Sequence, residues 1–299
     1  MNQAVTVTPR DLIGLRGAGE RLSLPVARVR AGRSGGYRSP FRGRGMEYEE
    51  SRRYQAGDDI RNMDWRVTAR TGAPHTKLYR EERERPLLFG MDFRRSMFFA
   101  TRGAFKSVVA CRIAALLAWH GSHQGDRVGG VLWSGAGHRE MRPRRGPRGV
   151  LGLVSALCAF AARPDGDNGE SAGMEPLAAR LRRVAHPGSL VFVLSDFRGF
   201  TRSVEDLLAP IGRHSTLVCC LIHDPIEAAL PEPGRYLLRD GDRELVIDTR
   251  DRSRRARYEA RFRARCEAVE NFCRRTSGRS LLCPTDTDPV SLLRTRLGA

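Results

Sequence analysis

Residues 87–92 (LLFGMD), 189–195 (SLVFVLS) and 216–222 (TLVCCLI) decide the fold class of this chain. Each is a short run in which nearly every side chain is apolar, and the first two lead directly into the carboxylates of Asp92 and Asp196. Strands that are apolar on both faces are typical of parallel sheets, because helices cover both sides of such sheets. We therefore expect these three runs to be buried strands.

Segments with helical spacing separate these strands. The apolar positions predict helices over residues 105–124, 148–162, 175–184, 204–211 and 252–275, strands over 127–133, 137–142 and 280–283, and a hairpin over 236–247. The alternation of strands and helices predicts an α/β domain over residues 86–299, with a mostly parallel sheet and helices on both faces.

The composition is that of a globular protein. The chain has 299 residues, of which 40% are apolar and 7% aromatic, so it can bury a sizeable core. Seven cysteines without a C-x-x-C pair indicate reduced thiols rather than a secreted disulfide scaffold. The first residues lack the apolar core of a signal peptide, and the run 150–162 is too short to span a bilayer. We expect a cytoplasmic protein without a membrane span.

The charge balance is strongly basic. Lys and Arg number 52 against 34 acidic residues, which gives a net charge of +18, and only Lys77 and Lys106 are lysine. Such a preference for arginine is typical of GC-rich coding sequences, so it weakens an inference from basicity to nucleic acid. The arginine clusters at 142–148 and 252–265 keep non-specific nucleic-acid binding as an alternative, but no zinc-finger, RRM or helix-turn-helix pattern supports it.

Two segments precede the α/β domain. Residues 1–40 are rich in Gly and Arg, and the stretch 30–45 (RAGRSGGYRSPFRGRG) contains many turn formers, so we expect a flexible N-terminus. Residues 41–85 are dense in charge and lack a strong helical period, and we expect them to form a β-rich segment. The chain is therefore expected to have three parts, with boundaries near residues 40 and 85.

The strand ends predict a site. Ligands of open α/β sheets bind at the carboxyl ends of the strands, where Asp92 and Asp196 lie, and Ser96 follows shortly after Asp92. These three residues offer the oxygen ligands that Mg²⁺ prefers, so Mg²⁺ is the cofactor that the sequence suggests. Alternatively, the two aspartates accept hydrogen bonds from loop amides at the edge of the sheet.

The residues after the first strand resemble a known metal motif. Asp92-x-Arg94-x-Ser96, with Asp196 after a later strand, is similar to the D-x-S-x-S metal-ion-dependent adhesion site of von Willebrand factor A domains. Arg94 replaces the first Ser of the motif, and residues 143–149 (PRRGPRG) hold no Ser or Thr for the motif's Thr. The resemblance implies a degenerate site, in which Arg94 repels a cation and takes its place by pairing with Asp92 or Asp196.

Residues 43–70 carry the most distinctive pattern, GRGMEYEESRRYQAGDDIRNMDWRVTAR. It resembles the signature of the bacterial family called domain of unknown function 58, R-x-Y-x-x-G-D-D-x-R-x-x-D-W-x-x-x-A-R, followed by an E-x-x-R-P ending at Pro86. Family members carry a von Willebrand factor A-like domain directly after the signature, as the order of segments implies here. The matching positions are Arg52 or Arg53, Tyr54, Gly57, Asp58, Asp59, Arg61, Asp64, Trp65, Ala69, Arg70, Glu82 and Arg85.

The signature has two physical interpretations. In one, alternating acidic and basic side chains form an ion-paired hairpin, with Trp65 as its apolar anchor. In the other, the segment is a surface that binds a partner protein, and Arg94 at the sheet edge engages a carboxylate of that partner. The residues expected to contact a partner are Arg94, Asp58, Asp59, Arg61, Asp64, Trp65 and Arg70.

The resemblance implies a function. Members of this family are viewed as partners or adaptors of MoxR-type AAA+ ATPases in the assembly or maturation of other complexes, so we expect a non-enzymatic protein-interaction module. A metal-dependent hydrolase that uses Asp92, Asp196 and the signature aspartates ranks last, because Arg94 and the basic loop oppose the two ions it would need. The chain has no Walker A, H-E-x-x-H or G-x-S-x-G motif.

Overall fold

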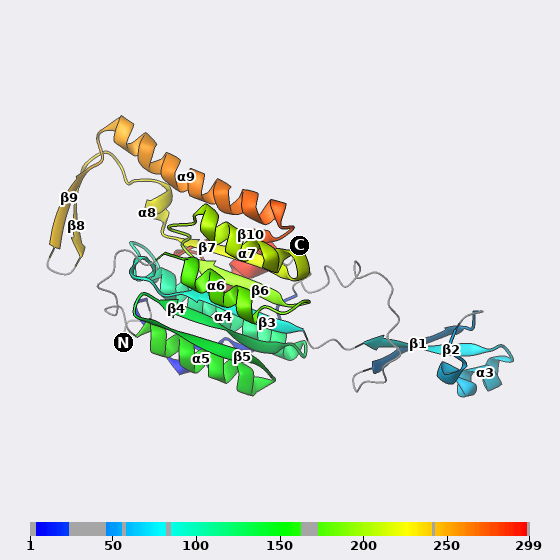
Figure 1. The fold of residues 1–299 in the computed structure, drawn as a ribbon. Coiled ribbons are helices and arrows are strands. Elements are labelled where there is room, and N and C mark those ends of the chain that lie inside the picture. The colour runs from blue at the N-terminus through cyan, green and yellow to red at the C-terminus, as the bar shows by residue number, and fades with distance from the viewer. Residues whose placement is uncertain are drawn as a thin grey trace. The chain divides into compact units, whose positions relative to one another are not determined.

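The computed structural model describes residues 4–23, 46–55, 58–81, 85–162, 173–240 and 243–297, and Figure 1 shows their fold. The chain divides into two compact units. One contains residues 1–31 and 85–299, and the other contains residues 32–84. We call the second the signature unit, because it contains most of the signature pattern.

A six-stranded sheet forms the centre of the larger unit. Its order is β10-β7-β6-β3-β4-β5, and every neighbouring pair is parallel except β4 with β5. The mostly parallel sheet expected from the sequence is therefore confirmed. The strands are β3 (Pro86–Asp92), β4 (Arg127–Ser134), β5 (Gly137–Arg145), β6 (Leu190–Ser195), β7 (Thr216–His223) and β10 (Arg279–Pro284).

Helices cover both faces of this sheet (Figure 1). On β3, Leu87 and Phe89 point into the core on one face and Leu88 into the core on the other, as the two-residue period of a strand requires. Gly90 lets a helix approach, because a Cβ at this position would lie 2.3 Å from Leu181. The first face packs against α4 (Lys106–His123), α5 (Pro147–Ala161) and α10 (Pro289–Leu297), and the second against α6 (Glu175–Val184), α7 (Arg202–His214) and α9 (Arg252–Arg275).

The N-terminal segment is ordered where the structure describes it. Helices α1 (Pro9–Gly14) and α2 (Arg16–Glu20) pack on the larger unit, and Leu12 is fully buried there. The Trp119 indole donates a hydrogen bond to the Leu12 carbonyl at 3.1 Å. The expectation of a flexible N-terminus is thus wrong for residues 4–23, because a capping box between Thr8 and Asp11 starts α1 despite the Gly-rich composition. Residues 24–40 lie outside the described ranges.

The signature unit combines a hairpin-like strand pair with a helix. Strand β1 (Met46–Arg53) pairs antiparallel with β2 (His75–Glu81), as a β-rich segment should, but η2 (Ile60–Asn62) and α3 (Trp65–Thr71) lie between them. Helix α3 was not expected. It begins because Asp64 accepts a hydrogen bond from the Val67 amide at 3.1 Å, and it ends at Gly72, whose φ of 69° is left-handed.

The remaining elements connect the core strands. They are η3 (Arg95–Met97), α8 (Pro225–Ala228) and the hairpin of β8 (Arg235–Asp240) with β9 (Arg243–Asp248), which confirms the predicted hairpin. Within the ranges that the structure describes, no helix is both long and apolar enough to cross a membrane.

Candidate functional site at the carboxyl edge of the sheet

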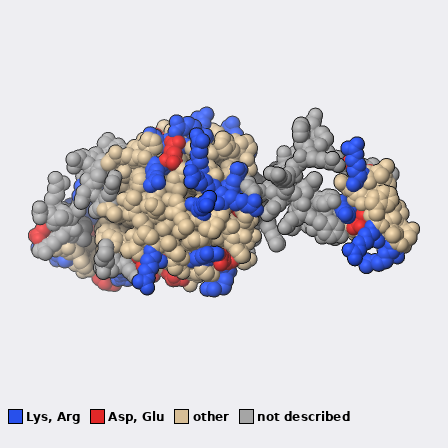
Figure 2. Space-filling model, turned by 90° about the horizontal axis from the view of Figure 1, so that it is seen from below, with Lys and Arg blue, Asp and Glu red and all other residues tan. Residues whose placement is uncertain are grey.

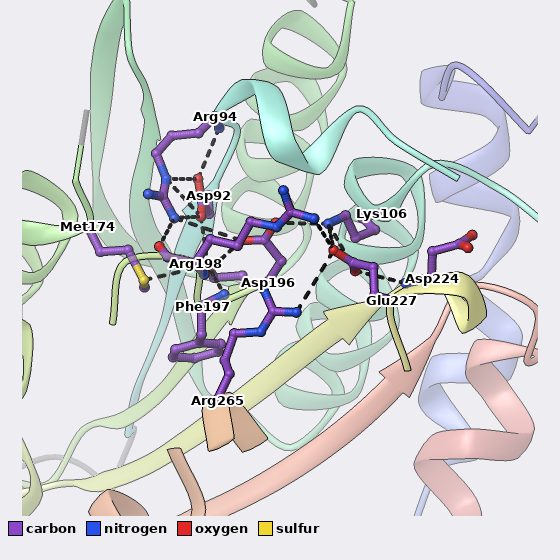
Figure 3. Close-up of polar contacts among 11 residues, drawn as sticks. Asp92, Arg94, Lys106, Met174, Asp196, Phe197, Arg198, Asp224, Glu227 and Arg265 are labelled. Atoms are coloured by element: carbon purple, nitrogen blue, oxygen red, sulfur yellow. Dashed lines mark hydrogen bonds and ion pairs between the residues drawn. The ribbon is translucent and has the colours of Figure 1, made fainter. Parts of the chain in front are cut away.

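Three acidic residues meet at one edge of the central sheet. Asp92 ends β3, Asp196 follows β6 and Asp224 follows β7, and all three are fully buried. The strands run parallel, so their carboxyl ends lie together, as the sequence predicted. Figure 3 shows basic side chains beside the carboxylates of Asp92 and Asp196, whereas the Asp224 carboxylate lies to one side of them.

Arg94 forms a fork-like ion pair with Asp92. Its Nε lies 3.0 Å from Asp92 Oδ1 and its Nη2 lies 2.7 Å from Oδ2. The Ser195 hydroxyl donates to the same carboxylate at 2.6 Å, and Arg94 Nη2 also donates to the Arg198 carbonyl at 3.0 Å. Burial alone would lower the pKa of Arg94, but the Asp92 carboxylate, together with those of Asp196 and Glu175, outweighs burial and raises this pKa.

This geometry corrects the expected role of Arg94. Its side chain is only 10% exposed, and its guanidinium is already engaged within the molecule. Arg94 therefore does not present a free guanidinium to the carboxylate of a partner. The alternative prediction, that Arg94 takes the place of a cation beside Asp92, agrees with the observed ion pair.

Lys106 provides a second internal cation. It is the first residue of α4, it is fully buried, and its Nζ lies 2.8 Å from Asp196 Oδ2 and 3.2 Å from both carboxylate oxygens of Glu227. Burial alone would raise the pKa of Asp196, but the Lys106 ammonium, together with Arg198, outweighs burial and lowers this pKa to about 2. The Asp196 carboxylate therefore stays charged at neutral pH.

Two further arginines flank Glu227 from different elements (Figure 3). Arg198, in the loop after β6, donates a hydrogen bond to Glu227, and Arg265 Nη2, from α9, lies 3.9 Å from the same carboxylate. The Arg198 side chain is 52% exposed, against 18% for Arg265. Arg198 is thus the most exposed of the four cations in this cluster.

A strained turn positions Arg198. Phe197 has a φ of 52°, a left-handed conformation that costs a residue other than Gly about 1–3 kcal/mol. Its amide donates to Ser195 Oγ at 2.9 Å, and its fully buried ring packs edge-on against Phe200. The next amide, that of Arg198, donates to Asp196 Oδ1 at 3.1 Å. The surrounding contacts therefore fix the turn that carries the exposed guanidinium.

Asp224 has a different, structural role. Its carboxylate accepts hydrogen bonds from the Thr101 amide at 2.7 Å and from the Thr285 hydroxyl at 3.0 Å. Burial alone would raise its pKa, but the hydrogen bonds from Thr101, together with those from the Ile226 amide and the Thr285 hydroxyl, outweigh burial and lower it. Asp224 also caps α8 together with Glu227. It thereby fastens the loop before α4 to the ends of β7 and β10.

The residues at this edge do not fit a divalent cation. The Asp92 carboxylate faces the Arg94 guanidinium, and the Asp196 carboxylate faces the Lys106 ammonium. Ser96 lies in η3 and takes no part in these hydrogen bonds. Across the described part of the chain, no three His, Cys, Asp or Glu side chains are grouped to hold a metal. At the degenerate site of Asp92, Ser96 and Asp196, both carboxylates therefore lie in internal ion pairs, as expected if Arg94 takes the place of a cation.

The signature aspartates are used within their own unit. Asp58 pairs with Arg52 at 2.7 Å, and Asp59 accepts a hydrogen bond from the Arg61 amide at 3.0 Å and so caps η2. Asp64 caps α3 and accepts a hydrogen bond from Ser51 Oγ at 2.6 Å. The expected alternating ladder of aspartates and arginines does not form.

Trp65 departs from its expected role. As an apolar anchor it should be buried, yet it is 66% exposed. Arg61 and Arg70 are also exposed. The signature unit thus turns its tryptophan and several arginines outward, while its aspartates serve as caps and ion-pair partners.

Sequence reasoning missed four members of the buried cluster: Lys106, Arg198, Glu227 and Arg265. One signal was available, since Lys106 is one of only two lysines in a chain that otherwise uses arginine. A compact ammonium fits between two carboxylates where a planar guanidinium would need more room. Glu227 had no comparable signal, because it reaches the cluster from a short helix beyond β7.

The fold and the site define an α/β protein in which two strand-end carboxylates, those of Asp92 and Asp196, are neutralised by its own basic side chains. The family model described as "Protein of unknown function DUF58" matches residues 50–268, and the chain belongs to this family.

Relatives of the chain are found in mycobacteria. The chain is 32% identical over 226 residues to "Uncharacterized protein Rv1480" of Mycobacterium tuberculosis and to "Uncharacterized protein Mb1516" of Mycobacterium bovis. The match covers 74% of this chain and 70% of each relative. Among solved structures, the conserved hypothetical protein BatB from Bacteroides thetaiotaomicron matches with a TM-score of 0.41 and 13% identity, over 71% of this chain and 95% of that one.

Proposed function

We propose that this DUF58 protein is a non-enzymatic interaction module that acts in the cytoplasm as a partner or adaptor of a MoxR-type AAA+ ATPase. Its task would be to help assemble or mature other complexes. We further propose that its larger unit is a von Willebrand factor A-like domain that binds its partner without a divalent ion. The choice of ATPase rests on the resemblance of the signature to its family.

The buried cluster at the sheet edge is the observation that carries this proposal. Lys106 is fully buried between two carboxylates, out of reach of a substrate, and the pKa of Asp196 is about 2, so Asp196 is not suited to exchange protons with a substrate at neutral pH. Ser195 is fully buried as well and donates its hydrogen bond to Asp92. The cluster is thus suited to keep the carboxyl edge of the sheet rigid, and we call this edge, with its buried ion pairs and Arg198, the rim. The exposed Arg198 is suited to bind an acidic group of a partner.

Non-specific binding of nucleic acid is the second candidate. Basic side chains cover more of the face shown in Figure 2 than acidic ones do. Arg142, Arg144 and Arg148, at β5 and the start of α5, are exposed. Attraction of this kind depends on charge alone and weakens steeply as salt rises.

The test is binding between the full-length chain and the purified MoxR-type ATPase of its own host, after nuclease treatment, at low and high salt. We expect a complex that survives high salt and is the same with Mg²⁺ and with EDTA. Retention of nucleic acid alone, lost at high salt, would favour the second candidate. If EDTA dissociated the complex in the absence of nucleotide, the proposal that the partner binds without a divalent ion would be refuted.

A matched pair of variants tests the rim itself. Arg198→Gln removes the exposed guanidinium of the cluster. Arg202→Gln removes a nearby guanidinium that is 75% exposed and pairs with Glu205 and Asp206 on the surface of α7. We expect the first variant to weaken the complex and the second to leave it unchanged. Equal effects of both would show that general charge, rather than the rim, drives binding.

A further inference from the structure

The signature unit exposes two large apolar side chains close together in sequence. Trp65, the first residue of α3, is 66% exposed, and Ile60 in η2 is 65% exposed. In contrast, Trp119 in the larger unit is 3% exposed. Tryptophan is among the residues that dominate the energetics of protein interfaces, because it buries a large rigid surface on binding. An exposed tryptophan five residues from an exposed isoleucine therefore indicates a contact surface.

Three arginines accompany these apolar residues. Arg61, Arg66 and Arg70 are exposed, and the last two are four residues apart on α3, so they lie on one face of the helix. None of the three forms an ion pair within the described residues of the unit. The carboxylates nearest in sequence have partners of their own, since Asp58 pairs with Arg52, Asp59 accepts from the Arg61 amide and Asp64 caps α3. Among the described residues, these three guanidiniums therefore carry positive charge without an acidic partner, in the same stretch of chain as Ile60 and Trp65.

We propose that the Trp65 surface, defined as Ile60, Arg61, Trp65, Arg66 and Arg70, binds an acidic segment of a partner protein that carries at least one large apolar side chain. The carboxylates of that segment pair with the three guanidiniums, and its apolar side chain packs against Trp65 and Ile60. This inference rests on the proposed function and specifies the chemistry of the partner.

A protein segment suits this surface better than single-stranded nucleic acid does. Proteins that bind single strands stack successive bases on several aromatic side chains along a basic groove. The surface has one aromatic residue, and its second apolar member, Ile60, offers no ring for stacking. Tryptophan, arginine and an aliphatic neighbour are instead the composition of a protein-binding hot spot.

The probe is a fluorescein-labelled synthetic peptide in which Glu and Asp residues flank a Phe-Leu pair, and its binding to the full chain is measured by fluorescence polarisation. Trp65→Ala and the triple variant Arg61→Gln/Arg66→Gln/Arg70→Gln are each expected to weaken binding at least about tenfold. The matched control removes three exposed charges from β5, with Arg139→Gln, Arg142→Gln and Arg144→Gln. It should change binding by less than about twofold.

Three outcomes would overturn the proposal. The control triple would weaken binding as much as the surface triple, which would show simple charge attraction. A peptide without the Phe-Leu pair would bind equally well, which would remove the apolar contact. A short single-stranded DNA would bind through Trp65 while the peptide would not, which would make the surface a nucleic-acid site.

Quenching of tryptophan fluorescence by acrylamide adds an independent measurement. The spectrum of the chain minus that of Trp65→Phe isolates the emission of Trp65. We expect strong quenching in the free chain and protection when the peptide is bound. If Trp65 is already protected in the free chain, the chain itself covers this surface and the proposal fails.

The same variants separate this inference from the proposed function. If the ATPase binds the unmodified chain and Trp65→Ala equally well, the interaction module stands and the Trp65 surface does not. If peptide binding depends on Trp65 but the ATPase does not bind at all, the surface stands and the choice of ATPase fails.

Discussion

Replacing Lys106 with methionine would remove one charge from the buried cluster and leave an unbranched apolar chain in its place. The ammonium is fully buried, 2.8 Å from Asp196 Oδ2 and 3.2 Å from both carboxylate oxygens of Glu227. Breaking a buried pair by removing one partner costs about 3–5 kcal/mol, because an uncompensated charge stays in the interior. We expect Lys106→Met to lower the free energy of unfolding by that amount.

Urea unfolding at neutral pH measures this loss directly, and thermal unfolding provides a second readout. For a domain of this size, each kcal/mol corresponds to about 2–4 °C in Tm, so Tm should fall by roughly 6–20 °C. Arg202→Gln is the surface control, because the Arg202 side chain is 75% exposed. Exposed ion pairs contribute about 0–1 kcal/mol, so this variant should unfold almost like the unmodified chain.

The pH dependence tests whether the loss is electrostatic. In the unmodified chain the pKa of Asp196 is about 2, below its ordinary value of 3.8. Asp196 therefore adds stability that is complete above pH 3.8 and is lost as the pH falls toward 2. Without the ammonium, the largest cause that lowers this pKa is gone while burial still raises it, so we expect the folded variant to take up a proton at a higher pH than the unmodified chain. The difference between the two proteins should be largest at neutral pH and should shrink on acidification.

A second substitution makes the reasoning refutable. Lys106→Met combined with Asp196→Asn removes both charges of the closest pair and should recover part of the lost stability. A loss of less than about 1 kcal/mol for Lys106→Met, or one that stays constant from neutral to mildly acidic pH, would show that the ammonium does not hold the cluster together.

Three further predictions concern other parts of the fold. Leu12→Ala should lower the free energy of unfolding by about 2–5 kcal/mol, because the Leu12 side chain is fully buried. The control is Ile13→Ala, at a residue that is 40% exposed, and it should lower the free energy of unfolding by less than about 0.5 kcal/mol. Equal losses in the two variants would mean that α1 does not pack on the core. Mg²⁺ and EDTA should leave Tm unchanged, whereas a saturable rise with Mg²⁺ would reveal a cation site. Asp224→Ala should cost about 1–3 kcal/mol in urea unfolding, because it leaves Thr101 and Thr285 without their acceptor; a smaller loss would contradict the anchoring role.

The central strands were predictable from the sequence because the apolar side chains of each strand are enough to show that it is buried. In residues 87–92, side chains on both faces of the strand are apolar, so no other placement removes both sets from water. Asp92 and Asp196 could be placed at one edge for the same reason, since parallel strands end on the same side. The packing of the N-terminal helices could not be predicted from the sequence. The three buried apolar residues in and beside them, Val7, Leu12 and Leu22, are separated in sequence and pack only against the folded α/β unit.

The signature unit is a part of the chain for which the sequence pattern gave the wrong contacts. Its alternating charges suggested a ladder of ion pairs, but each aspartate instead accepts hydrogen bonds from a nearby backbone amide or side chain. Asp64 illustrates the choice, because it caps α3 and accepts from Ser51 rather than pairing with an arginine. Trp65 became a surface residue at the first turn of that helix.

The sequence by itself determined the parallel α/β sheet, the strand-end carboxylates and the family signature, because apolar periodicity and turn residues act over a few positions. Arg94, which neutralises Asp92, lies two residues away in the same motif, but only the tertiary structure decided what neutralises Asp196 and Glu227. Lys106 lies 90 positions from Asp196 and 121 from Glu227 along the chain, and no local pattern links them. Buried carboxylates need a counter-charge from whichever element packs against them, and here that element is the first turn of α4.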